Sequence, residues 1–209
     1  MSFSLNEMEA TAKRATRGAG YCWGQAEEAA KATRWLCAQG LDGASSLAAL
    51  LSLGFASNPS MHRPKGASGV WTGEVALCPL SVGPLLSDSA HLLDEGHIEI
   101  HDLAAPALLL PFASYAARAL NCAVAVEIDQ IEAITDGVAL SAPDRFPARA
   151  QRVVIHRSAD PVSPCAQHTR ANPTDADWDT LTTFAHRTYA PATEESRLLG
   201  AGAGLSDND

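Results

Sequence analysis

The sequence is poor in positive charge. Its 209 residues include 15 Lys and Arg residues against 24 Asp and Glu residues, so the formal net charge is −9. A negative protein is poorly suited to bind nucleic-acid phosphates or an anionic membrane surface. The most apolar stretch, residues 103–117, contains two prolines and is shorter than the roughly 20 residues of a membrane-spanning helix. We therefore expect neither nucleic acid nor a membrane among the partners.

Paired cysteines and an export signal are also missing from the sequence. The five cysteines contain no C-x-x-C pair, and their odd number leaves one without a partner in any monomeric disulfide scheme. The first residues have no basic segment followed by an apolar one. We therefore predict a cytoplasmic protein with reduced thiols, in which Cys37, Cys78 and Cys122 serve as small apolar core residues.

With 46% hydrophobic and 19% charged residues, the composition is that of a folded globular chain. Its first quarter has helix signals. Ser4 and Glu7 form a capping-box pattern that predicts a helix over 5–17, a second helix opens at Trp23 and ends at Gly40, and a third follows over 44–53. Because a loop rich in Pro and Gly follows, we predict one domain over 1–209, with 1–54 as a helical lobe within it.

The middle of the chain has strand signals. Residues 97–101 alternate polar and apolar, and Asp136-Gly137 is typical of a two-residue hairpin turn within 124–141. Thr174 is placed to cap a helix whose apolar face we expect to dock on the sheet. The remaining predictions are strands at 70–77, 108–110, 124–131 and 150–156, helices at 85–93 and 113–120, and an extended connection at 160–173.

Helices at both ends of the chain around a run of strands are typical of an α+β fold. We predict N-terminal helices, a central and mostly antiparallel sheet of five or six strands, and C-terminal helices.

The first candidate site is His97, Glu99 and His101, which alternation places on one face of one strand. Two imidazoles and a carboxylate can hold a divalent metal such as Zn²⁺ that activates water, or can act as acid and base without a metal. The alternative is that they form the solvated face of a strand whose Ile98 and Ile100 point inward.

The second candidate site lies near the C-terminus. Arg197, next to Ser196, offers a two-pronged contact for a carboxylate, and Gly202 and Gly204 permit close approach of a ligand or of a second subunit in a homo-oligomer. The alternative is a capped helix and a flexible end. Tyr21 and Trp23 gather aromatic surface between the first two helices, and serve either the core or a ligand platform.

Several segments resemble known families. The strings LNEME (5–9), GAGYCWGQAEEA (18–29), TYAP (188–191) and GAGAGLSDND (200–209) resemble a bacterial family of unknown function over nearly the full length. Residues 3–50 are similar to the N-terminal helices of the malate/L-lactate dehydrogenase family with a non-Rossmann fold. Ser46 matches the serine of that family's Ser-His-Gly element, and Leu47 stands in place of its histidine.

Two functions follow from these patterns. One is a small-molecule enzyme of hydrolase or lyase type, with His97, Glu99 and His101 as catalytic or metal-binding residues, and with Arg197, Ser196, Tyr21 and Trp23 binding the substrate. The other is a non-catalytic protein, either an oligomeric accessory subunit or a small-molecule binder.

Overall fold

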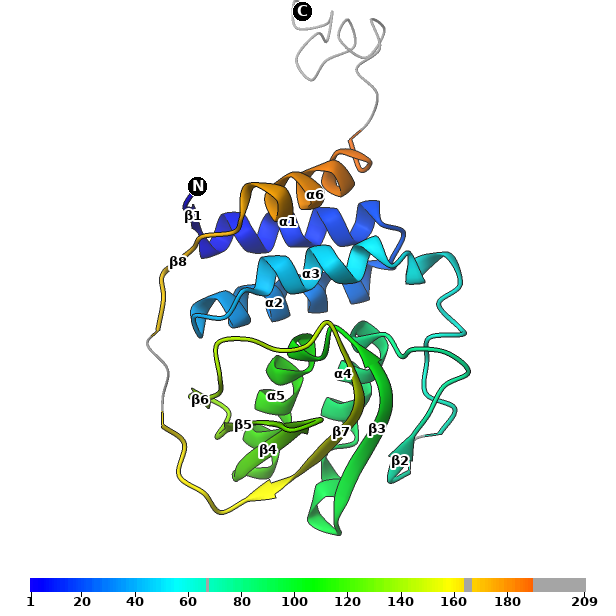
Figure 1. The fold of residues 1–209 in the computed structure, drawn as a ribbon, viewed down its shortest axis with the longest axis vertical. Helices are drawn as coiled ribbons and strands as arrows, with labels where there is room; N and C mark the ends of the chain where they lie inside the picture. Colours follow the sequence, from blue (N-terminus) through cyan, green and yellow to red (C-terminus); the bar gives the residue numbers. More distant parts are fainter. Residues whose placement is uncertain (67, 164–166, 190–209) are drawn as a thin grey trace, which may run out of the picture.

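The computed structural model describes residues 1–66, 68–163 and 167–189, and it has the predicted α+β architecture. One layer consists of helices α1 (Leu5–Gly18), α2 (Trp23–Ala38), α3 (Gly43–Ser52) and α6 (Asp175–His186) (Figure 1). A second layer contains a six-stranded sheet together with α4 (Pro79–Asp88) and α5 (Leu110–Leu120). Short 3₁₀ helices lie at Phe55–Ser57 (η1), Ala90–Asp94 (η2) and Pro106–Leu109 (η3).

Local sequence determines where α1 begins. The Ser4 hydroxyl accepts a hydrogen bond from the Glu7 amide at 3.2 Å, and the Glu7 carboxylate accepts one from the Ser4 amide at 2.7 Å. The predicted capping box is thus confirmed, and it satisfies two amides that a helix start otherwise leaves unpaired. The predicted ends of the second and third helices agree with α2 and α3 to within about two residues, the usual uncertainty of helix boundaries.

The six-stranded sheet has the order β2-β3-β7-β4-β5-β6. Every pairing is antiparallel except β2 with β3, which confirms a mostly antiparallel sheet. The strands are β2 (Val70–Trp71), β3 (His97–Ala104), β4 (Ala123–Ile128), β5 (Ile131–Thr135), β6 (Leu140–Ser141) and β7 (Arg149–Ser158). A separate antiparallel pair joins β1 (Phe3–Ser4) to β8 (Arg170–Ala171), so the segment that precedes α1 is paired with the segment that precedes α6.

The two faces of β3 differ in burial. Ile98 and Ile100 are fully buried, whereas His97 is exposed and Glu99 and His101 are partly exposed. Helix α5 packs against β4 and β5, and its apolar face joins the same buried cluster as Ile98 and Ile100. That cluster extends from Met8 in α1 to Leu181 in α6, so the two layers share one continuous core.

Several predictions for short apolar runs are wrong, because such a run is compatible with either a strand or a helix. The segment predicted as a strand over 70–77 is a strand only at β2, and the one predicted over 108–110 belongs to η3 and α5. The helix predicted over 85–93 begins earlier, at Pro79, and gives way to η2 after Asp88. The strand predicted over 124–131 is interrupted at Asp129, where a positive φ of 53° turns the chain from β4 into β5.

The predicted docking of the last helix on the sheet is also wrong. Thr174 does cap α6, accepting a hydrogen bond from the Asp177 amide at 3.1 Å. Helix α6, however, packs mainly against α1 and α3, and its Trp178 stacks on Phe3 of the short strand β1 rather than on the six-stranded sheet. A helical period identifies an apolar face but not the element on which that face packs.

Within the described residues, no helix combines the length and apolar character that crossing a membrane requires.

The contact between α1 and α6 depends on Gly18. A Cβ atom at this position would lie 1.8 Å from the Phe184 carbonyl oxygen. We therefore expect Gly18→Ala to push α6 away from α1 and to lower the free energy of unfolding by about 1–3 kcal/mol, the usual range for overpacking. Urea denaturation measures this change.

The matched control is Gly24→Ala in α2, where a Cβ atom meets nothing within 4 Å. This variant should be as stable as the wild type or gain up to about 1 kcal/mol from helix propensity. Equal stabilities of the two variants would show that the α1–α6 contact does not need the glycine.

Candidate functional site

The predicted site on β3 is part of a polar network on the sheet. The Glu99 carboxylate contacts Arg152 at 2.5 Å and His101 Nε2 at 2.6 Å. The hydrogen bond from Arg152, helped by His101, lowers the pKa of Glu99 to about 2. Glu99 therefore stays ionised at neutral pH, and its oxygens are occupied by two side chains of its own sheet.

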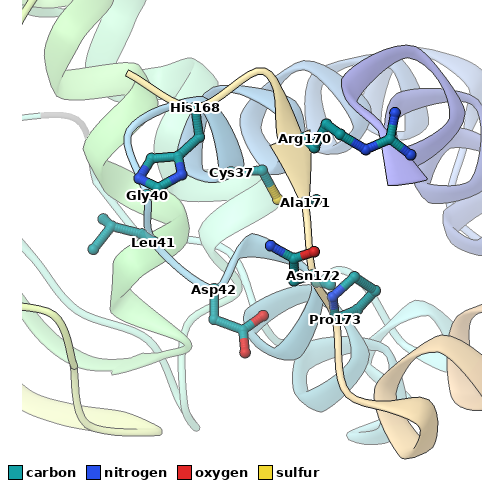
Figure 2. A pocket seen from close by; sticks show the side chains of 10 residues that line it. Cys37, Gly40, Leu41, Asp42, His168, Arg170, Ala171, Asn172 and Pro173 are labelled. Carbon is teal, nitrogen blue, oxygen red and sulfur yellow. The ribbon is translucent and has the colours of Figure 1, made fainter. Parts of the chain in front are cut away.

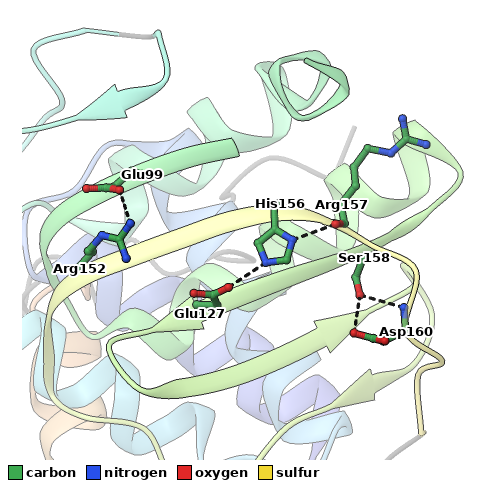
Figure 3. A network of polar contacts seen from close by, with 7 residues as sticks. All are labelled: Glu99, Glu127, Arg152, His156, Arg157, Ser158 and Asp160. Carbon is green, nitrogen blue, oxygen red and sulfur yellow. Dashed lines mark hydrogen bonds and ion pairs between the residues drawn. The ribbon is translucent and has the colours of Figure 1, made fainter. Parts of the chain in front are cut away.

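The network continues across β7 onto β4, through residues that the sequence did not single out (Figure 3). His156 lies opposite His97 in the β3–β7 register, and its Nε2 is 3.0 Å from the Glu127 carboxylate. Its Nδ1 is 2.9 Å from the Arg157 carbonyl oxygen. Both neighbours only accept hydrogen bonds, so the doubly protonated ring satisfies both, and the pKa of His156 is raised.

These contacts bear on the predicted metal site. In residues 1–66, 68–163 and 167–189, no group of three or more His, Cys, Asp or Glu side chains is arranged to hold a metal ion. His97 and His101 stand two residues apart on the exposed face of β3, and Glu99 between them is engaged by Arg152. The structure thus gives no support to a metal at His97, Glu99 and His101, and their acid–base role stays a prediction.

Of the four residues predicted to bind substrate, the structure describes Tyr21 and Trp23, and these two differ in burial. Tyr21 is 3% exposed, and its hydroxyl lies 3.6 Å from the Cys78 sulfur inside the core, where burial raises the pKa of the phenol. Trp23, the first residue of α2, is 64% exposed. Ser196 and Arg197 fall outside the described residues, as do Gly202 and Gly204.

Trp23 borders a cavity of about 410 Å³ between α1, the start of α2 and the segment after α6. We call this cavity the cationic corner, and its lining residues are Ala10, Lys13, Arg14, Arg17, Trp23, Thr188 and Tyr189. Helical spacing explains the α1 part, because positions three and four apart lie on the same side of a helix. Docking of α6 on α1 brings Tyr189 next to Arg14, whose guanidinium donates a hydrogen bond to the Tyr189 hydroxyl at 2.8 Å.

The charges of the cationic corner are only partly neutralised. Lys13 pairs with Glu27 at 2.7 Å. Arg14 and Arg17 form no salt bridge with any acidic side chain in the described part of the chain; instead they donate to the Ala10 and Tyr21 carbonyl oxygens, respectively. The Arg17 guanidinium lies 4.5 Å, and the Lys13 ammonium 5.8 Å, from the centre of the Trp23 ring. An acidic protein thus concentrates uncompensated positive charge around one exposed indole.

Other cavities are less suited to a ligand. The one in Figure 2, beside Cys37, Asp42, His168 and Asn172, has a volume of about 170 Å³, below the roughly 300 Å³ of small ligand pockets. Burial raises the pKa of the Cys37 thiol to about 11, so the thiol stays protonated and unreactive.

In two larger cavities, acidic side chains either line the cavity or pair with most of its cations. The first, of about 400 Å³ between α3 and the loop before β7, contains Asp42, Asp144 and Arg145, and the Asp42 carboxylate is occupied in capping α3. The second, of about 360 Å³ beside Trp35 and Tyr115, contains three cations, of which Lys31 pairs with Glu28, Arg34 pairs with Glu9 and Arg118 lies over the Tyr115 ring.

Comparison with known proteins yields one family. The sequence model of a family described as "Protein of unknown function (DUF3726)" matches residues 3–80. The expected similarity to an uncharacterised family is confirmed over this segment, which contains the α1 and α2 residues of the cationic corner. Its extension beyond residue 80 to nearly the full length, a bacterial origin and the likeness to dehydrogenase helices stay predictions. No curated protein matches the chain.

The geometry around His156 predicts how stability depends on pH. Its folded pKa lies above the unfolded value of about 6.5, so the protonated ring stabilises the fold fully below pH 6.5. This contribution is lost as the pH rises through the folded pKa. Urea denaturation at pH 5.5 and pH 8.5 should therefore show a larger loss for His156→Gln at pH 5.5.

Glu127→Gln serves as the partner variant, because it keeps an oxygen that accepts a hydrogen bond but removes the negative charge. Glu127→Gln should reproduce part of the pH-dependent loss of stability that is expected for His156→Gln. If His156→Gln costs the same stability at both pH values, the raised pKa of His156 is wrong.

Proposed function

We propose that this protein binds a small organic anion that carries a planar ring, at the cationic corner. The observation that carries the proposal is that Lys13 and Arg17 lie over the exposed indole of Trp23, in a cavity of about 410 Å³ that Arg14 also lines. This volume lies within the range of small-molecule pockets. Of the functions expected from the sequence, small-molecule binding is the one that this geometry supports best.

The chemistry of each group fits a distinct part of such a ligand. A guanidinium presents parallel N–H donors that match a carboxylate or phosphate, and Arg14 and Arg17 have no acidic side chain in the described residues to compete for these donors. The flat indole of Trp23 offers an apolar surface on which a ligand ring can stack. The Tyr189 hydroxyl, held by Arg14, adds a polar edge.

The exposure of the aromatic residues also supports binding. Trp23 is 64% exposed and Tyr189 is 54% exposed, although removing either side chain from water would lower the free energy of the protein. Two such residues beside one cavity form an exposed aromatic surface rather than a scattered one, and surfaces of this kind mark interaction sites.

A simple probe tests this proposal. 2-Naphthoate combines a ring with one carboxylate, and 2-naphthamide has the same ring without the charge. By isothermal titration calorimetry, naphthoate should bind with a Kd in the millimolar range and naphthamide at least about tenfold more weakly, since losing one charged hydrogen bond costs about 1.5 kcal/mol or more. Arg17→Gln should weaken naphthoate binding by a similar factor.

Arg118→Gln is the matched control, because Arg118 also lies over an aromatic ring, 5.0 Å from the centre of Tyr115, but at a different cavity. This variant should bind naphthoate like the wild type. Equal affinity for naphthoate and naphthamide, equal effects of the two arginine variants, or no naphthoate binding at about 10 mM would each overturn the proposal.

A second proposal, an enzyme of hydrolase or lyase type, keeps one supporting observation. Glu99 contacts His101 Nε2 at 2.6 Å, and a carboxylate in this position can orient an imidazole that exchanges protons. His101 is 44% exposed and thus reachable by a substrate, whereas His97 would assist from the same face of β3.

The metal version of this second proposal is open to direct measurement. Protein purified without a histidine tag should contain about one equivalent of zinc if His97, Glu99 and His101 hold a metal, and His97→Ala should remove it. Because Arg152 already occupies Glu99, we expect a zinc content far below one equivalent that does not change in His97→Ala. Stoichiometric, His97-dependent zinc would contradict this expectation.

A further inference from the structure

We propose that the ligand of the cationic corner is elongated, with one anionic head at Arg14 and Arg17 and an apolar tail that reaches Phe3 and Trp178. This inference rests on the proposed function and adds the class of ligand. It comes from a second cavity that adjoins the first along α1.

The second cavity also has a volume of about 410 Å³. We call it the aromatic end, and it is lined by Phe3, Asn6, Glu7, Ala10, Thr11, Arg14 and Trp178. It shares Ala10 and Arg14 with the cationic corner, so the two cavities adjoin at these residues. A ligand bound at one cavity can therefore extend into the other without leaving the surface of α1.

Helix geometry sets the length of this path. Residues 6, 10, 14 and 17 follow one another at intervals of three or four along α1, which places them on a single helix face. At a rise of 1.5 Å per residue, the path from residue 6 to residue 17 is about 16 Å long. A ligand that uses both cavities is thus longer than a single ring with one acidic group.

The aromatic end suits an apolar group. The rings of Phe3 and Trp178 are stacked, with their centres 3.7 Å apart and their planes 17° from parallel, and both side chains remain partly exposed. Such a stack presents a rigid apolar wall to whatever occupies the cavity. The pair joins β1 to α6, so it depends on the same docking of α6 that places Tyr189 at the other end.

Among the described residues, the aromatic end is lined by a carboxylate and the cationic corner is not, which orients the ligand. Glu7 is the one charged residue besides Arg14, in the described part of the chain, that lines the aromatic end. Its carboxylate accepts a hydrogen bond from the Ser4 amide at 2.7 Å, and this bond lowers the pKa of the carboxyl group. Its negative charge at neutral pH repels a second acidic group at this end. The geometry therefore favours a ligand with one acidic end over one that is acidic at both ends.

Arg14 lies between the aromatic end and the cationic corner, and two hydrogen bonds hold its side chain in place. Its Nε donates to the Ala10 carbonyl oxygen at 3.1 Å, while another nitrogen donates to the Tyr189 hydroxyl at 2.8 Å. A guanidinium restrained at two points can meet the anionic head without losing much side-chain entropy. The methylene groups of Arg14 can line the path that the tail follows.

A series of phenylalkanoates tests the length of the ligand. Phenylacetate, 4-phenylbutanoate and 8-phenyloctanoate have the same head and the same terminal ring but different spacers. In the wild type, calorimetric affinity should rise about two- to fourfold per added methylene that becomes buried, up to the length that reaches Trp178. In Trp178→Leu the affinity for 8-phenyloctanoate should fall about tenfold, with that for phenylacetate unchanged.

Phe3→Leu provides a second variant in case Trp178→Leu lowers stability, and thermal melting together with unchanged phenylacetate binding verifies that each variant is folded. The proposal of an elongated ligand is wrong if affinity does not depend on chain length. It is also wrong if affinity rises with chain length as steeply in Trp178→Leu and Phe3→Leu as in the wild type. In that case short anions still bind in an Arg17-dependent way. Failure of the proposed function itself would instead abolish the dependence of phenylacetate binding on Arg17.

Octanoate and octanedioate, which have the same number of carbons but one and two carboxylates, test whether Glu7 disfavours a second acidic group. The wild type should bind octanoate more tightly. Glu7→Gln should bring the two affinities closer, because an amide keeps the capping contact without the charge. Tighter binding of octanedioate to the wild type would overturn the assignment of a single acidic end.

Discussion

The close packing of α6 on α1 is the contact on which both candidate cavities depend. At Gly18 the Phe184 carbonyl lies where a Cβ atom would be, so the two helices approach at backbone distance. This approach brings Tyr189 to Arg14 at one end of α1 and Trp178 to Phe3 at the other. Tyr189, which is 175 positions from Arg14 in sequence, thus completes a surface whose charges all come from the N-terminal helices.

Charged side chains are mostly paired on the sheet but only partly paired at the cationic corner. On the sheet, Glu99 pairs with Arg152 and Glu127 with His156 across neighbouring strands, and Arg157 pairs with Asp94 of η2, so acids and bases satisfy one another. Such pairs add little free energy at an exposed surface, but they leave few groups free to engage a ligand. At the cationic corner the arginines bind carbonyl and hydroxyl oxygens, which keep their charge uncompensated. This contrast is the physical reason for preferring the corner over the strand as a binding site.

The comparison between sequence and structure shows where local patterns are sufficient. The capping box at Ser4, the cap at Thr174 and the alternation along β3 involve neighbours a few residues apart, and all were predictable. The exposed Trp23 was also among the predicted ligand-binding residues. Tyr21, two positions away, is in the core, because its ring turns toward Cys78 while Trp23 begins the next helix at its solvent-facing side. Spacing alone does not distinguish these two aromatic residues.

The sequence by itself determined the α+β class, the N-terminal helices and the polar face of β3, since these depend on composition, caps and periodicity within short windows. Only the tertiary structure decided that Arg152 occupies Glu99 and that α6 covers helices instead of the six-stranded sheet. It also decided that Lys13 and Arg17 lie over Trp23 in a cavity shared with Arg14 and Tyr189. These features join residues far apart in the chain. They follow from how the whole apolar surface is buried at once, which no local pattern encodes.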